Sequence, residues 1–106
     1  MPILEKDIQL AICELLALKK QFFWRQNTAP AVQKDASGWR FRSMPAYSKK
    51  GVPDIIWIRN GKFIGLEVKR PKGIQSDVQK EFESACKEAG GEYYVVTSVD
   101  DVIKMV

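Results

Sequence analysis

The sequence predicts an α/β domain in which helices flank a mixed central sheet. Three features support this prediction: a β-hairpin centred on Asn60-Gly61, an amphipathic helix before it, and a helix followed by an apolar strand after it. A strand that follows a helix can rejoin the sheet through a crossover and pair in parallel with its neighbour. We therefore expect the element order α-β-β-β-β-α-β-α within a single domain of 106 residues.

The N-terminal part is predicted to contain one helix and two strands. Apolar side chains recur at the helical period in residues 2–20, which indicates an amphipathic helix. Residues 22–25 are typical of a strand, and residues 39–44 alternate apolar and basic side chains, the pattern of a half-buried strand. Residues 31–38 show no period, so we expect a loop there.

The C-terminal part is predicted to form a helix, a strand and a short helix. Residues 76–89 form the first helix, which ends at a glycine pair, and residues 93–97 form a strand that is apolar on both faces. Residues 99–105 form the last helix. The first helix is expected to bury an apolar stripe made of Val78, Phe82, Ala85 and Ala89.

The central hairpin consists of residues 54–58 and 63–68, joined by Asn60-Gly61. An Asn-Gly pair between apolar runs is the strongest short-range hairpin signal, because both turn residues must adopt positive φ. Counting back from a two-residue turn places Asp54 directly opposite Glu67. The two form a non-hydrogen-bonded pair, with Cβ atoms about 4.5–5.5 Å apart.

This carboxylate pair suits a hard divalent cation. Like charges opposite each other destabilise a sheet, and Lys69, two residues beyond Glu67 on the same face, offsets their repulsion only in part. Pro53 falls opposite Val68 and has no N–H, so the Val68 carbonyl is expected to lack a partner on that side. Two carboxylates and a free carbonyl form an oxygen-only set suited to Mg²⁺ or Mn²⁺. A surface hairpin with incidental charges is the alternative.

The composition limits the possible chemistry. Histidine is absent, which excludes Ser-His-Asp and Cys-His catalysis and most zinc sites. Lysine and arginine number 17 against 13 acidic residues, and such a basic surplus suits a polyanionic partner. No apolar run is long enough to span a membrane and no signal peptide opens the chain, so we expect a soluble, cytoplasmic protein. Cys13 and Cys86 are expected to be buried thiols without a disulfide.

Around the hairpin the sequence resembles a nuclease family. The residues that carry the resemblance are Gly51-Val52-Pro53-Asp54, then Gly65-Leu66-Glu67-Val68-Lys69, then Gln79. They resemble the VRR-NUC (virus-type replication-repair nuclease) domain, in its stand-alone form, within the PD-(D/E)XK superfamily. The resemblance implies a restriction-endonuclease-like core and a Mg²⁺- or Mn²⁺-dependent DNA endonuclease. Asp54, Glu67 and the Val68 carbonyl would hold the metal, and Lys69 would orient or activate the attacking water.

Two further residues each have two explanations. The family carries a glutamate in its first helix, which implies a metal-site role for Glu5, but an acid near a helix N-terminus is also favoured by the helix dipole. The family also carries a glutamine at the position of Gln79, which implies a catalytic role. Ser76-x-x-Gln79 is, however, equally consistent with a capping box.

The expected partner is DNA. Phosphate contacts would come from basic residues that lie near the hairpin in sequence, although a solvated face is the alternative for any one of them. These residues are Arg25, Arg40, Arg42, Lys49 and Lys50.

The resemblance further implies a homodimer that acts on branched or four-way-junction DNA, because two strands need two active patches. Some apolar residues lie outside the apolar face of the first helix or outside any predicted helix or strand, and these could form the dimer interface. They are Leu10, Ala17, Ala46 and Tyr47. A nuclease-like module that binds DNA without cutting it, and a small restriction-type endonuclease, are the alternatives to this function. No small-molecule cofactor is expected.

Overall fold

The structure, a computed structural model, describes residues 3–26, 32–35, 38–41 and 45–106, with side chains described in 3–26 and 45–106. Its elements follow the chain in this order: α1 (Glu5–Leu18), β1 (Phe22–Arg25), β2 (Val32–Asp35), β3 (Gly38–Phe41), β4 (Ile55–Arg59), β5 (Lys62–Val68), α2 (Asp77–Glu88), β6 (Glu92–Val96) and α3 (Val99–Ile103).

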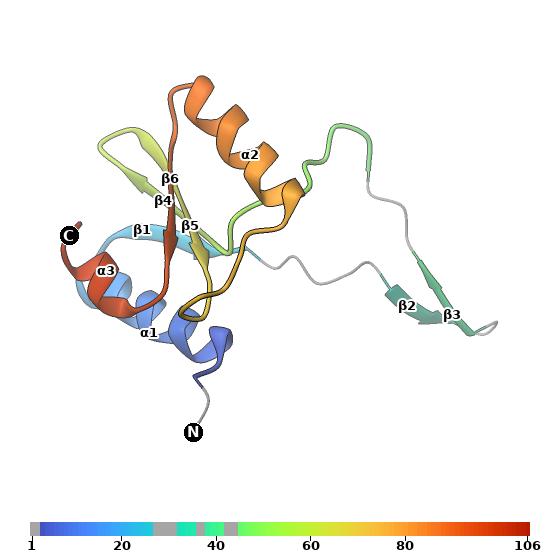
Figure 1. The fold of residues 1–106 in the computed structure, drawn as a ribbon, viewed down its shortest axis with the longest axis horizontal. Helices are drawn as coiled ribbons and strands as arrows, with labels where there is room; N and C mark the ends of the chain where they lie inside the picture. The colour runs from blue at the N-terminus through green and yellow to red at the C-terminus, as the bar shows by residue number, and fades with distance from the viewer. Residues whose placement is uncertain (1–2, 27–31, 36–37, 42–44) are drawn as a thin grey trace.

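A four-stranded mixed sheet forms the centre of the domain, in the order β1-β4-β5-β6 (Figure 1). β4 is antiparallel to both of its neighbours, whereas β6 is parallel to β5, because α2 carries the chain across between them. This arrangement confirms the predicted α/β class with a mixed sheet flanked by helices.

The main core lies between the sheet and α1. Ile12 and Leu16 of α1 are fully buried, and Val102 of α3 completes this layer. They pack against the strand residues Ile55, Trp57, Ile64, Leu66, Val68 and Val96. The buried indole of Trp57 keeps a partner, because its Nε1 donates to Gln21 Oε1 at 3.1 Å. Successive strand residues alternate between faces, so Glu67 points to the opposite face, on which α2 lies.

The register of the β4–β5 hairpin agrees with the prediction from the turn. Asn60 and Gly61 have φ values of 52° and 77°, as a tight hairpin turn requires. Arg59 pairs with Lys62, and the ladder continues to the pair of Ile55 and Leu66. The next pair beyond this ladder is Asp54 and Glu67.

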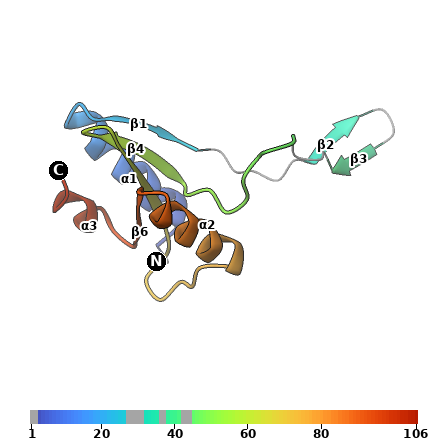
Figure 2. The same ribbon diagram turned by 90° about the horizontal axis from the view of Figure 1, so that it is seen from above.

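The segment before β4 corrects the prediction. Residues 31–38 were expected to form a loop, but Val32–Asp35 is a strand, β2, which pairs antiparallel with β3. The sequence pattern did not predict this strand, because only one of its four residues is apolar and no alternation of apolar and polar side chains is visible. The β2–β3 hairpin forms a separate sheet, set apart from the central sheet in both views (Figures 1 and 2). The predicted strand at 39–44 is thus a hairpin strand, β3, and residues 42–44 lie outside the described residues.

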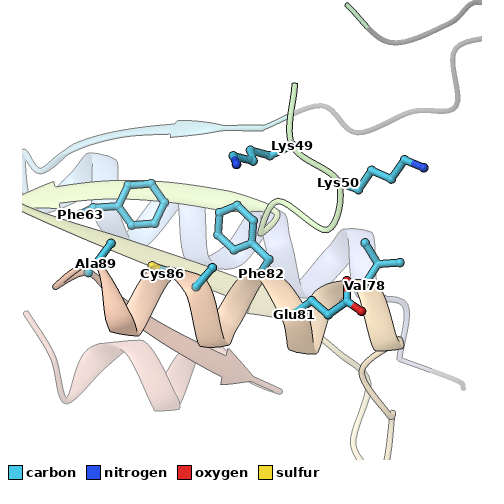
Figure 3. Close-up of a pocket in the computed structure, with 10 residues that line it drawn as sticks. Lys49, Lys50, Phe63, Val78, Glu81, Phe82, Cys86 and Ala89 are labelled. Atoms are coloured by element: carbon cyan, nitrogen blue, oxygen red, sulfur yellow. The ribbon is translucent and has the colours of Figure 1, made fainter. Parts of the chain in front are cut away.

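α2 also differs from expectation, because none of its residues is buried. Val78 is 40% exposed and Phe82 is half-buried. The helix lies chiefly over β6, at the margin of the sheet, so its apolar stripe does not reach the sheet centre. The stripe instead lines a groove of about 840 Å³ together with Phe63, Lys49 and Lys50 (Figure 3). The two cysteines, expected to be buried, are free and half-buried.

Candidate active site

Two carboxyl groups meet where the β4–β5 ladder ends. Glu67 lies on β5 and is 2% exposed, which makes it the only buried charged residue in the part of the chain whose side chains are described. Asp54 directly precedes β4, and its carboxyl group lies close enough to Glu67 for its charge and hydrogen bonding to raise the pKa of Glu67. The structure therefore brings together the pair that the turn register predicted.

A main-chain contact fixes the orientation of Asp54. In a regular continuation of the ladder, the Val68 N–H would meet the Pro53 carbonyl. Asp54 Oδ2 accepts from this N–H instead, at 2.8 Å. The acid therefore replaces a main-chain acceptor at the end of the ladder, and this bond directs its carboxylate toward β5.

Both oxygens of Glu67 accept hydrogen bonds from neutral donors. Gln79 Nε2 lies 3.0 Å from Oε1, and the Tyr93 hydroxyl lies 3.4 Å from Oε2. Tyr93 in turn lies 3.4 Å from Gln75 Nε2. Sequence reasoning missed Tyr93 and Gln75, because Tyr93 reaches the site through the parallel pairing of β5 and β6, and no local sequence signal sets that register.

Gln79 forms the capping box that its sequence context predicted, and it also contacts Glu67. Its backbone N–H donates to Ser76 Oγ at 3.2 Å, and its Oε1 accepts from the Ser76 N–H at 2.9 Å, which completes a capping box. The amide nitrogen of the same side chain remains available and donates to Glu67. One side chain therefore starts α2 and contacts the buried carboxyl group.

The surroundings of Glu67 hold it in the protonated state at neutral pH. Burial raises the pKa of Glu67 to about 8, and the negative charge of Asp54 and its hydrogen bond act in the same direction. The Lys69 ammonium and the Tyr93 hydroxyl oppose this shift but do not cancel it. The pKa of Tyr93 is itself raised, mainly by burial and next by the charge of Glu67, so its hydroxyl stays protonated and acts as a donor.

Two glycines allow the backbone segments around the site to approach closely. A Cβ at Gly65 would lie 2.6 Å from Pro53 Cγ, so Pro53 packs directly over this position of β5. Gly51 has φ 73°, and a Cβ there would lie 2.5 Å from the Val78 carbonyl oxygen at the start of α2. These contacts set the distance between the segment that carries Asp54, the strand β5 and the helix α2.

Of the two remaining predicted site residues, Lys69 lies near the carboxyl pair and Glu5 does not join it. Lys69 is half-buried and close enough to Glu67 to act on its charge. In the part of the chain that the structure describes, no three acidic or cysteine side chains gather to hold a metal ion, so Glu5 does not complete such a group with Asp54 and Glu67. Glu5 lies instead in the first turn of α1, where the helix dipole favours an acid.

The residues proposed to contact DNA do not all lie on the same face of the sheet. Arg25 pairs with Ile55, whose side chain faces α1, and its Nε donates to Gln9 Oε1 at 3.0 Å, so it lies on the face opposite Glu67. Lys49 and Lys50 are exposed and line the groove beside α2. The side chain of Arg40 and the whole of Arg42 lie outside the described residues.

Comparison with known proteins adds no relative to this description. No family model, curated protein or solved structure matches the chain. Within the described ranges, no helix is long and apolar enough to cross a membrane. Any functional assignment therefore depends on the carboxyl pair and its neighbours.

Proposed function

We propose that this chain is a Mg²⁺- or Mn²⁺-dependent DNA endonuclease of the PD-(D/E)XK type, similar to stand-alone VRR-NUC domains. The observation that carries the proposal is the buried Glu67, whose pKa is raised by the nearby Asp54 carboxyl group, which the Val68 N–H orients toward β5. A buried acid next to a second acid is costly in a stable fold, and such perturbed groups concentrate at functional sites.

The residues present fit a divalent cation. Glu67 is almost completely removed from water, and the charge of Asp54 raises its pKa, so a cation in place of the proton would relieve the repulsion between the two acids. The donors are carboxylate oxygens, with the Val68 carbonyl as a proposed third, and such hard ligands select Mg²⁺ or Mn²⁺. When bound, such an ion lowers the pKa of a water molecule and stabilises charge on the phosphate.

The protein's own residues would supply orientation and charge. Asp54 and Glu67 are held in place, Asp54 by the Val68 N–H and Glu67 by Gln79, so little reorganisation is needed on substrate binding. Lys69 is near enough for its charge to lower the pKa of Glu67, and we propose that its ammonium orients the attacking water toward the phosphate.

DNA is the proposed substrate. The chain carries a net charge of +4, and the exposed Lys49 and Lys50 lie on the same side of the sheet as α2 and Glu67. Phosphate contacts of this kind supply affinity that does not depend on base sequence.

We also propose a homodimer that acts on branched DNA, because each chain carries one active site and two active sites are needed to cut two strands. Apolar surface is available for it: Leu10 is 52% exposed and Tyr47 is fully exposed, and Ala17 and Ala46 are exposed as well. The groove along α2 provides further apolar surface on the face that carries Glu67.

Neutral substitutions of the two acids test the proposal. Asp54→Asn and Glu67→Gln should each abolish cleavage of plasmid and four-way-junction DNA in Mg²⁺ or Mn²⁺, and excess EDTA should do the same to the wild type. Asp100→Asn and Glu88→Gln make the same chemical changes at exposed helix positions and should leave cleavage unchanged. Full cleavage by either site variant would refute the assignment.

A further inference from the structure

A chain of polar contacts connects the surface of α2 with Glu67. Lys87 Nζ lies 2.6 Å from Glu83 Oε2, and Gln75 Nε2 lies 3.2 Å from Glu83 Oε1. Gln75 Nε2 also lies 3.4 Å from the Tyr93 hydroxyl, which lies 3.4 Å from Glu67 Oε2. The chain therefore begins at a solvent-exposed ion pair and ends at the buried acid.

The first members of this chain determine the direction of its last hydrogen bond. The hydrogen bond from Lys87 lowers the pKa of Glu83, so Glu83 is ionised and can only accept. The Gln75 amide must then present its nitrogen to Glu83, and the same nitrogen donates to the Tyr93 oxygen. Because Gln75 donates to it, Tyr93 has its own hydroxyl proton available for Glu67.

Packing holds the Tyr93 ring in this place. Tyr93 is 3% exposed, and its ring centroid lies 6.1 Å from that of Phe82 on α2. On its strand, Tyr93 pairs with Gly65, two residues before Glu67 on the same face of β5. Packing and strand pairing therefore fix the position of the ring, so the hydroxyl has little freedom to move away from Glu67.

The two neutral donors act on different oxygens of the same carboxyl group. Gln79 donates to Oε1 and Tyr93 donates to Oε2, so the two hydrogen bonds together fix the rotation of the Glu67 carboxyl group. We infer that Tyr93, oriented by Gln75, is a positioning residue that holds Glu67 in the orientation in which it binds a divalent cation. This inference rests on the proposed function, because it assigns a support to the proposed metal ligand. Removing such a support typically weakens metal binding 10–100-fold.

The test measures Mn²⁺ affinity by calorimetry, in the absence of DNA. Tyr93→Phe removes only the hydroxyl and should weaken Mn²⁺ binding about 10–100-fold, while the melting temperature of the metal-free protein stays close to that of the wild type. Tyr94→Phe is the matched control, because this neighbouring hydroxyl bonds the carboxylate of Glu92 rather than Glu67. Tyr94→Phe should bind Mn²⁺ as the wild type does.

A second variant separates positioning from packing. Gln75→Leu removes the donor that orients the Tyr93 hydroxyl and should also weaken Mn²⁺ binding, by less than Tyr93→Phe. In the double variant the Gln75→Leu effect should disappear, because Gln75 acts only through the hydroxyl that is already missing. A purely structural role would instead make the two losses add.

The outcomes distinguish this inference from the proposed function. Unchanged Mn²⁺ affinity in Tyr93→Phe, or additive losses in the double variant, would overturn the positioning role and leave the metal site standing. Failure of the wild type to bind Mn²⁺ at all would overturn both proposals.

Discussion

The raised pKa of Glu67 makes the stability of the metal-free protein depend on pH in an unusual direction. Its folded-state pKa of about 8 exceeds the ordinary value of 4.5, so between these values the folded state binds more protons than the unfolded state. Stability is therefore greatest at the acidic end of this window and is lost as pH rises through the folded-state pKa. Most carboxyl groups in folded proteins produce the opposite trend.

The magnitude follows from one proton per molecule. Between pH 5.5 and 7.5 the free energy of unfolding should fall by about 1.4 kcal/mol per pH unit, or about 2–3 kcal/mol over this range. The sequence contains no histidine, so no other side chain has an ordinary pKa within this range. The signal of Glu67 should therefore be readable without correction for histidine titration.

Urea denaturation at a series of pH values, with EDTA present, would measure this dependence. Glu67→Gln should abolish the slope. Asp54→Asn should reduce it but not remove it, since burial is the largest cause of the shift and remains in that variant. Saturating Mg²⁺ should reverse the trend, because the ion competes with the proton for the ionised carboxylate. A flat wild-type profile between pH 5.5 and 7.5, or a slope that persists in Glu67→Gln, would refute the reasoning.

Three further predictions concern catalysis, DNA binding and assembly. Lys69→Ala should slow cleavage by about 10²-fold in a single-turnover assay, because Lys69 is proposed to orient the attacking water. Calorimetry should show that metal affinity is retained, because Lys69 is not a proposed ligand. Alanine at Arg40, Arg42, Lys49 and Lys50 should flatten the dependence of log K on log salt by about 0.9 per lost contact in duplex binding, and an unchanged slope would mean that these residues are only solvated. Light scattering at micromolar concentration should report a homodimer, and gel assays should show faster cleavage of four-way junctions than of linear duplex; a monomer that nicks both equally would contradict this prediction.

The sequence predicted the carboxyl pair because the information needed is local. Asn60-Gly61 specifies the turn, the turn specifies the register, and the two-residue period of a strand then places Asp54 opposite Glu67. The capping box at Gln79 is local in the same way. These features need no knowledge of the rest of the fold.

What the sequence could not predict depends on contacts between distant elements. The parallel register that places Tyr93 beside Glu67 is set by packing across the α2 crossover, and the strand itself is apolar on both faces. The position of α2 at the sheet margin likewise depends on the whole layer, so its apolar periodicity suggested burial that the structure does not contain. The weakly apolar strand β2 was missed for a third reason, because its pairing with β3 is not visible in its own pattern.

The close approaches at Gly51 and Gly65 determine how this site would tolerate mutation. Neither residue takes part in the proposed chemistry, yet a side chain at either would push on Val78 or Pro53 and so displace the segment that carries Asp54. A random library selected for activity should therefore retain both glycines as strictly as the acids. Gly61, at the hairpin turn, has open space around its Cβ position and would report only the cost of its positive φ.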